Sequence, residues 1–108
     1  MGEEVIILSD ENFHREIGNS EIPFLINFWS SWCSPCKRVT LTVEELAREY
    51  RGKIKVGKMN VDENPITPRM FGIMNIPGLL LLRDGQVVDK FVGVTPKVAL
   101  KEHLKMIF

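Results

Sequence analysis

The sequence predicts an α/β fold with a parallel sheet at its centre. Three segments with strand character, at residues 5–8, 24–29 and 53–61, alternate with two segments of helical periodicity, at residues 11–17 and 34–50. Short apolar or alternating runs favour strands, whereas apolar residues spaced three and four apart favour helices. The order strand, helix, strand, helix, strand is typical of parallel strands joined by right-handed crossovers.

The N-terminal segment predicts a short strand followed by a short helix. The strand is the apolar run at residues 5–8. Ser9 or Asp10 is expected to cap a helix over residues 11–17, because their side-chain oxygens can accept hydrogen bonds from the first turn. This helix would face the core through two apolar residues, Phe13 and Ile17.

Residues 24–29 and the segment after Cys33 predict a second strand and a second helix. Residues 24–29 are apolar except at Asn27, which indicates a strand buried on both faces. The helix after Cys33 is expected to continue to about Tyr50, with Gly52 as its C-terminal cap. Residues 53–61 then alternate between lysines and apolar side chains, as a half-buried strand does.

The second half predicts a short helix, a hairpin and a final helix. The short helix is expected to begin at Pro68. Strands at residues 79–82 and 87–92 flank Asp84 and Gly85, a dipeptide that favours a tight hairpin turn. Thr95 and Pro96 are expected to start the last helix, which carries Leu100, Leu104 and Ile107 on one face.

The two cysteines of the chain, Cys33 and Cys36, fall where a buried strand gives way to a helix. Unpaired N–H groups in a first helical turn favour negative charge there, and the thiolate is the nucleophilic form of cysteine. Residues three apart on a helix have Cβ atoms about 5–6 Å apart, whereas a disulfide needs about 3.5–4.5 Å. Pro35 suits a tightened first turn, because its φ is fixed and it has no N–H. The pattern indicates a pair of thiols for redox chemistry.

Composition and charge exclude several other classes. Lys and Arg total 14, as do Asp and Glu, so the formal net charge is zero and nucleic acid is not expected as a partner. No apolar run approaches the roughly 18 residues of a membrane span. The acidic start and the short apolar run that follows do not fit a signal peptide. We therefore expect one domain, residues 1–108, in the cytoplasm, where an isolated CxxC pair is more often catalytic or metal-binding than structural.

A metal clip is the main alternative for the cysteine pair. A structural zinc site needs about four ligands, and the two histidines, His14 and His103, fall on other predicted helices. A metal or cluster shared between two chains stays open, but no metal is expected within one chain.

Four segments together carry a resemblance to the thioredoxin family over nearly the whole chain. They are FWSSWCSPCK at residues 28–37, KMNVDENP at 58–65, FGIMNIPGLLLLRDG at 71–85 and FVG at 91–93. The resemblance implies a thioredoxin fold, with a central mixed five-stranded sheet flanked by four helices. It also implies that the last two strands run antiparallel to the others.

The resemblance implies a role for each residue of the site. Cys33 would attack a substrate disulfide and Cys36 would resolve the mixed disulfide, with Pro35 supporting the pair and Pro77 facing it after a cis peptide bond. The substrate would dock on a flat surface, and its backbone would pair with the chain just before Pro77. The residues of that surface would be Trp32, Ser34, Ile76, Val92 and Gly93, flanked by Val61.

This chain departs from the family pattern at four positions. Asn27 stands where the family has a buried aspartate that relays a proton to the deeper thiol, and an amide cannot titrate. Ser34 replaces a glycine, Leu41 a helix proline and Gly78 a threonine, all near the cysteines or the substrate groove. Lys58, whose family counterpart lies near that aspartate, is either a plain charge on a strand or a residue that shifts the pKa of its neighbours.

The expected function is thiol–disulfide oxidoreduction, namely reduction of protein disulfides by the Cys33–Cys36 dithiol. No bound cofactor is expected. The resemblance implies a flavin-dependent thioredoxin reductase as electron donor and disulfide-bearing proteins as substrates, and we expect a monomer without membrane partners. Two alternatives stay open: an oxidant or isomerase of altered redox poise, and a thioredoxin-fold binding module whose thiols matter less.

Overall fold

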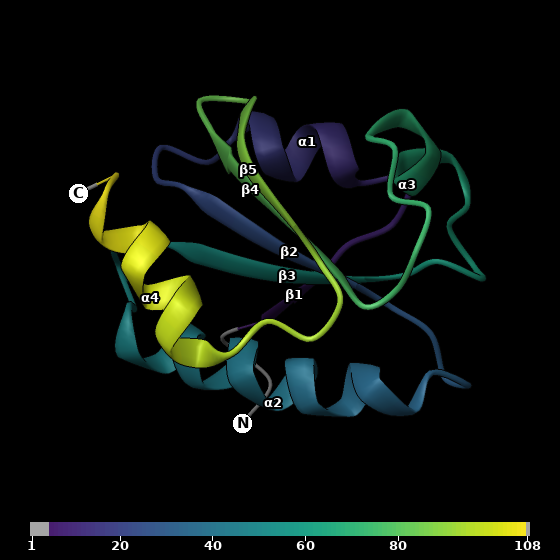
Figure 1. Cartoon of the computed structure of the whole chain (residues 1–108). Coiled ribbons are helices and arrows are strands. Elements are labelled where there is room, and N and C mark those ends of the chain that lie inside the picture. The colour runs from purple at the N-terminus through teal and green to yellow at the C-terminus, as the bar shows by residue number, and fades with distance from the viewer. Residues whose placement is uncertain (1–4, 108) are drawn as a thin grey trace.

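The computed structural model describes residues 5–107 as a five-stranded sheet between two pairs of helices (Figure 1). The strand order is β1-β3-β2-β4-β5; β1, β3 and β2 are parallel, β4 runs antiparallel to β2, and β5 runs antiparallel to β4. Strand β5 therefore runs in the same direction as the first three strands, and the expectation that both last strands oppose the others is wrong for β5. The mixed sheet flanked by four helices is confirmed. In chain order the elements are β1 (Val5–Ile7), α1 (Phe13–Gly18), β2 (Phe24–Trp29), α2 (Ser34–Glu49), β3 (Lys55–Asn60), α3 (Ile66–Met70), β4 (Gly78–Arg83), β5 (Gln86–Val92) and α4 (Lys97–Lys105).

The two faces of the sheet carry separate apolar cores. Helices α2 and α4 cover one face, and α1 and α3 cover the other (Figure 1). On α2, Val39, Val43 and Leu46 are at most 1% exposed and share one side of the helix. They pack against β2, β3, β4 and α4. Burial of each such side chain stabilises the fold by about 1.5–3 kcal/mol.

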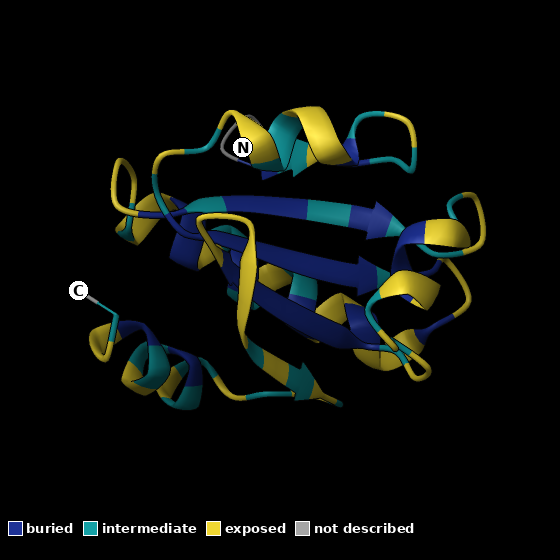
Figure 2. Cartoon of the chain, turned by 90° about the horizontal axis from the view of Figure 1, so that it is seen from above, coloured by how far each residue is buried: buried dark blue, intermediate teal, exposed yellow. Residues whose placement is uncertain are grey.

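The middle of the sheet is buried on both faces, as residues 24–29 predicted. Figure 2 shows β2 and β4 almost entirely in the colour of buried residues and β3 in the colours of buried and intermediate residues, whereas β5 is largely exposed. Asn27 lies at the centre of β2, opposite Lys58 on β3 and Leu79 on β4. It is a polar side chain with no exposed surface. Asn27 also lies against α2, the helix that carries Cys36, so this buried amide needs a structural or functional reason.

The cap predicted for the first helix is wrong. The N-cap residue of α1 is Asn12, not Ser9 or Asp10, and its side chain makes no cap hydrogen bond. Asn12 Oδ1 instead accepts from the Ser9 N–H at 2.7 Å. The Asp10 carboxylate lies at the start of α3, where it accepts hydrogen bonds from the backbone N–H groups of Ile66 and Thr67 at 3.0 and 2.8 Å. Asp10 therefore caps a helix far along the chain.

Three other boundaries differ from the predicted ones. The C-cap of α2 is Tyr50, not Gly52, which follows two residues later with a φ of 83°. Helix α3 begins at Ile66, so Pro68 lies within its first turn, where the missing N–H costs no helical hydrogen bond. Helix α4 follows Pro96 as its N-cap, and Thr95 caps nothing; its hydroxyl donates to the Gly93 carbonyl at 3.4 Å. The hairpin at Asp84 and Gly85 is confirmed, because both residues have positive φ, at 53° and 76°.

Candidate active site

Cys33 and Cys36 lie at the N-terminus of α2, beyond the end of β2. Cys33 is the N-cap residue, with extended backbone angles (φ −94°, ψ 99°), and Pro35 lies in the first turn. The two cysteines form a disulfide, with Cα atoms 5.4 Å apart. Both are nearly buried, at 5% and 2% exposure. The strand-to-helix junction expected for the pair is therefore present.

The local backbone favours a thiolate at Cys33. Helix α2 has 16 residues, so its dipole places partial positive charge at the end where Cys33 lies. The Cys36 N–H donates to the Cys33 carbonyl at 3.2 Å, which closes the first turn. A cysteine at a helix N-terminus has a more stable thiolate than a free cysteine, and is the more reactive for it.

An exposed tryptophan lies beside the cysteines. Trp32 is 70% exposed, and its indole Nε1 donates to the Asp62 carboxylate at 2.9 Å. Asp62 is held in turn by Asn60, whose side-chain oxygen accepts from the Asp62 N–H at 2.9 Å. Asp62 was not among the residues expected at the site. Its one signal was its position in the family-like segment at residues 58–65.

The loop before β4 brings the other predicted docking residues to the same end of the sheet. Gly78 opposes Phe28 near the end of β2, and it opposes Val92 on β5. The Ile76–Pro77 peptide bond is cis, as the resemblance implied. The Gly93 N–H donates to the Pro77 carbonyl at 2.9 Å. Pro77 is thus fixed between β2 and β5, at the sheet end from which the chain enters the cysteine loop.

The four departures from the family pattern have different surroundings. Ser34 is exposed at the start of α2, and Leu41 is 62% exposed on the same helix. Gly78 has little spare room, because a Cβ there would lie 3.2 Å from the Asn75 carbonyl oxygen. Asn27 has no exposed surface, and its Nδ2 donates to the Thr40 hydroxyl at 3.3 Å.

A pocket of about 380 Å³ opens beside Cys36. Its lining includes Cys36 and Thr40 from α2, Lys58 from β3, and Trp29. The Lys58 ammonium lies 5.7 Å from the centre of the Trp29 ring, a distance that allows a cation–π contact. Sequence reasoning missed Thr40. Its signal was a spacing of four residues from Cys36, which places both side chains on one side of a helix.

No metal centre accompanies the cysteines in the part of the chain that the structure describes. Within residues 5–107, no cluster of three or more His, Cys, Asp or Glu side chains could hold an ion. His14 lies on α1 and His103 on α4, as the sequence predicted. Among the described helices, none is both long and apolar enough to cross a bilayer.

Comparison with known proteins agrees with the fold and the cysteine spacing. The thioredoxin family model matches residues 4–106. The chain is 48% identical to thioredoxin of Haemophilus influenzae over 101 residues, which is 94% of each chain. It is 44% identical to thioredoxin 1 of a Nostoc species, over 91% of this chain and 92% of that one. It is 45% identical to thioredoxin 2 of Chlorobaculum tepidum, over 89% and 88% respectively.

These matches cover nearly the whole chain, including the strand-to-helix junction with its CxxC pair. Family membership implies protein disulfides as substrates and a reductase as electron donor. The chain therefore belongs to the thioredoxin family and is a thiol–disulfide oxidoreductase that reduces protein disulfides.

Proposed function

We propose that Cys33 is the nucleophile of this reductase and that Cys36 resolves the intermediate. The Cys33 thiolate attacks one sulfur of a substrate disulfide, and the other substrate sulfur leaves as a thiolate. The Cys36 thiolate then attacks Cys33 Sγ, which breaks the bond between Cys33 and substrate and releases the second thiolate. Solvent protonates both leaving groups. Two electrons have then passed from the dithiol to the substrate, and the protein holds its own disulfide.

The position of Cys33 as N-cap of α2 is the observation that carries this assignment. The N–H groups without an intrahelical partner gather at that end of the helix, so they favour the thiolate of Cys33 more than that of Cys36. Cys36 lies one turn further along and is 2% exposed. It is placed to attack an intermediate already bound to Cys33.

The substrate chain docks on the surface formed by the residues around Cys33 and Pro77. Among residues 5–107, neither the backbone N–H nor the C=O of Ile76 has a hydrogen-bond partner. An extended substrate segment can pair with these groups as an added strand does. The side chains proposed to line this surface are Trp32, Ser34, Ile76 and Val92, together with Gly93 and the flanking Val61.

Four residues support the reacting thiols. Pro35 sets the first turn of α2, and Pro77 shapes the loop on which the substrate docks. Asn27 keeps the buried position beside the pocket neutral. Lys58 contributes a positive charge to the pocket of Cys36, which favours the thiolate over the thiol.

The partners of the reaction follow from the family and from the charge of the chain. We expect a flavin-dependent thioredoxin reductase as electron donor, and diverse disulfide-bearing proteins as substrates. The protein acts as a cytoplasmic monomer of one domain, residues 1–108, without a bound cofactor. The equal numbers of acidic and basic residues support the absence of a nucleic-acid partner.

Trapping the intermediate tests the roles of the two cysteines. The Cys36→Ser variant should accumulate a covalent complex with a disulfide-bearing protein substrate, detected by mass spectrometry without reductant. The Cys33→Ser variant should form none. Trapping by Cys33→Ser alone would reverse the assignment.

The reduction potential of the Cys33–Cys36 couple separates reduction from the competing activities. Thioredoxins lie near about −270 mV, and a value close to this supports a reductase. A value above about −200 mV would support the oxidant or isomerase that Asn27 and Ser34 could favour. Full biological function in a Cys33→Ser variant would support a binding module instead.

A further inference from the structure

We propose that the Thr40 hydroxyl donates a hydrogen bond to the Cys36 thiolate while the mixed disulfide is resolved. This role rests on the assignment of Cys36 as the resolving thiol. It makes Thr40 a catalytic residue that acts on release of the substrate, not on the first attack by Cys33.

Thr40 and Cys36 are neighbours on one side of α2. They are four residues apart, a spacing at which Cβ atoms on a helix are about 5–6 Å apart. Both side chains line the same pocket of about 380 Å³. Because both residues line one pocket and lie one turn apart, the Thr40 hydroxyl can approach the sulfur once Cys36 has left the disulfide.

Asn27 fixes the direction in which Thr40 can donate. The amide Nδ2 of Asn27 donates to Thr40 Oγ1 at 3.3 Å, from a side chain with no exposed surface. An amide nitrogen has hydrogens to give and no free lone pair to accept with. The Thr40 oxygen is therefore the acceptor of this bond, and its own hydrogen is left for another partner.

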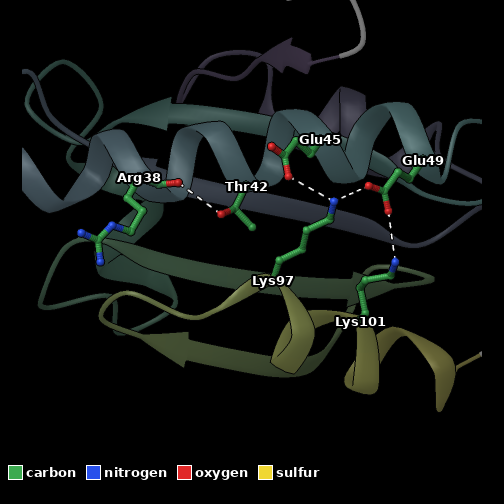
Figure 3. Close-up of polar contacts among 6 residues, drawn as sticks. All are labelled: Arg38, Thr42, Glu45, Glu49, Lys97 and Lys101. Carbon is green, nitrogen blue, oxygen red and sulfur yellow. Dashed lines mark hydrogen bonds and ion pairs between the residues drawn. The ribbon is translucent and has the colours of Figure 1, made fainter.

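Among residues 5–107 of the disulfide form, the Thr40 hydroxyl donates no hydrogen bond. Asn27 Oδ1 is buried without a partner, so the hydroxyl does not donate back to the amide. Thr42 on the same helix behaves differently, because its hydroxyl donates to the Arg38 carbonyl at 3.2 Å (Figure 3). A thiolate at Cys36 supplies the charged acceptor that Thr40 lacks.

The charged groups around the pocket include both signs, and the buried amide beside Thr40 is neutral. The charged groups that line the pocket are Lys37 and Glu44 of α2 and Lys58 of β3, and Asn27 cannot accept a proton. In this proposal the proton of the Cys36 thiol passes to water in the open pocket, and Glu44 is the one carboxylate among the described lining residues. The Cys36 thiolate attacks Cys33 Sγ, and the substrate sulfur leaves and takes a proton from solvent. Thr40 keeps its own proton and stabilises the charged form, which a hydrogen bond favours.

Single-turnover kinetics test this role with the whole chain. Reduced protein is mixed with a disulfide-bearing protein substrate, and stopped-flow fluorescence separates the bimolecular attack from the unimolecular resolution. Thr40→Val should slow resolution about tenfold at neutral pH, as loss of a hydrogen bond to a charged group predicts. Its resolution rate should reach half-maximum at higher pH, and the first step should be unchanged.

Two variants control for side effects of the substitution. Thr40→Ser keeps the hydroxyl and should restore both the resolution rate and its pH profile. Thr42→Val removes a hydroxyl that already has a backbone acceptor, and it should leave both steps unchanged. Thr40→Ala provides a second test if Thr40→Val does not fold.

One result would overturn the proposal. If Thr40→Val or Thr40→Ala lowers the melting temperature but leaves the pH profile of resolution unchanged, Thr40 is only a structural partner of Asn27. The assignment of Cys36 fails separately, namely if Cys36→Ser does not trap the substrate. The two failures are therefore distinguishable.

Discussion

The indole nitrogen of Trp32 donates a hydrogen bond to the Asp62 carboxylate, 2.9 Å away, and so ties the cysteine loop to the turn after β3. Trp32 nevertheless stays 70% exposed. An exposed aromatic ring held in one orientation offers a substrate a flat apolar surface without further loss of side-chain entropy. The contact thus holds Trp32 in place on the proposed docking surface.

Asp62→Ala should weaken substrate binding and leave the fold intact. Without its acceptor, Trp32 samples other rotamers, and ordering it again costs about 0.5–1 kcal/mol, or roughly a 2- to 5-fold increase in KM. The measurement is steady-state reduction of a protein disulfide, with kcat and melting temperature expected near the unsubstituted values. Asp62→Asn keeps an acceptor and should show a smaller increase. An unchanged KM in Asp62→Ala would contradict a positioning role for this carboxylate.

Asp10 should support stability at neutral pH but not in acid. Partial burial raises the pKa of Asp10, but hydrogen bonds from the Thr67 hydroxyl and from the N–H groups of Thr67 and Ile66 outweigh it, so the net pKa is lowered. A lowered folded pKa means that the unfolded chain binds more protons in acid. The contribution of Asp10 to the stability of the fold is therefore present above the ordinary aspartate pKa of 3.8 and is lost as pH falls through the folded pKa.

Asp10→Ala should lower the free energy of unfolding by about 1 kcal/mol at pH 7, the usual cost of losing a helix cap. The difference from the unsubstituted protein should shrink below about pH 4, because the carboxyl is then protonated in both states. Urea unfolding at several pH values measures this. Asp10→Asn keeps an acceptor oxygen and should lose less at pH 7. A difference that is constant with pH would contradict the charged cap.

Most of the fold was predictable because each helix or strand is indicated by the residues within it and next to it. Residues 24–29 showed burial on both faces from their apolar run, and the hairpin followed from Asp84 and Gly85. The role of Asp10 was not predictable from a local pattern. A cap is recognised by the residues that follow it, whereas Asp10 serves a helix 56 residues later in the chain.

The same limit applies to the site. The position of Cys33 and Cys36 followed from a strand meeting a helix. The partners Asp62 and Thr40 did not, because each acts through a contact that the sheet creates: Trp32 with Asp62 across 30 residues, and Asn27 with Thr40 across 13. Sequence shows which residues can react, and the fold decides which polar groups stand next to them.

The ion pairs between α2 and α4 should depend on pH and salt. Lys97 contacts Glu45 and Glu49, and Lys101 contacts Glu49 at 3.2 Å (Figure 3). The hydrogen bond from Lys97 is the largest cause that lowers the pKa of Glu49, and the hydrogen bond to Glu49 is the largest cause that raises the pKa of Lys97. The contribution of Glu49 to the stability of the fold is lost as pH falls through its folded pKa. The contribution of Lys97 to stability is lost as pH rises through the folded pKa of Lys97.

Lys97→Met should therefore lower the melting temperature slightly between pH 4.5 and pH 10.5, the ordinary pKa values of glutamate and lysine, because both groups are charged in that range. The pairs are exposed to solvent, so the effect should be small and should fade in about 1 M salt. Thermal unfolding by circular dichroism at low and high salt measures it. Lys101→Met, which removes one contact instead of two, should give a smaller change. A loss independent of salt would assign the effect to packing of the Lys97 stem instead.

Asn27→Asp should both accelerate resolution of the mixed disulfide and lower the free energy of unfolding. A buried carboxyl beside Thr40 can accept the proton of Cys36, which an amide cannot, so resolution of the mixed disulfide should accelerate near neutral pH. Burial raises the folded pKa of the new carboxyl above its unfolded value, so the variant loses stability as pH rises, by at least about 1 kcal/mol at pH 7.

Stopped-flow kinetics and urea unfolding at pH 4 and pH 7 measure the two effects. Asn27→Ala removes the amide without adding a base, and it should lose stability without any gain in rate. If resolution is no faster in Asn27→Asp, proton transfer to a side chain at this position does not limit turnover, and water in the pocket of Cys36 already serves that step.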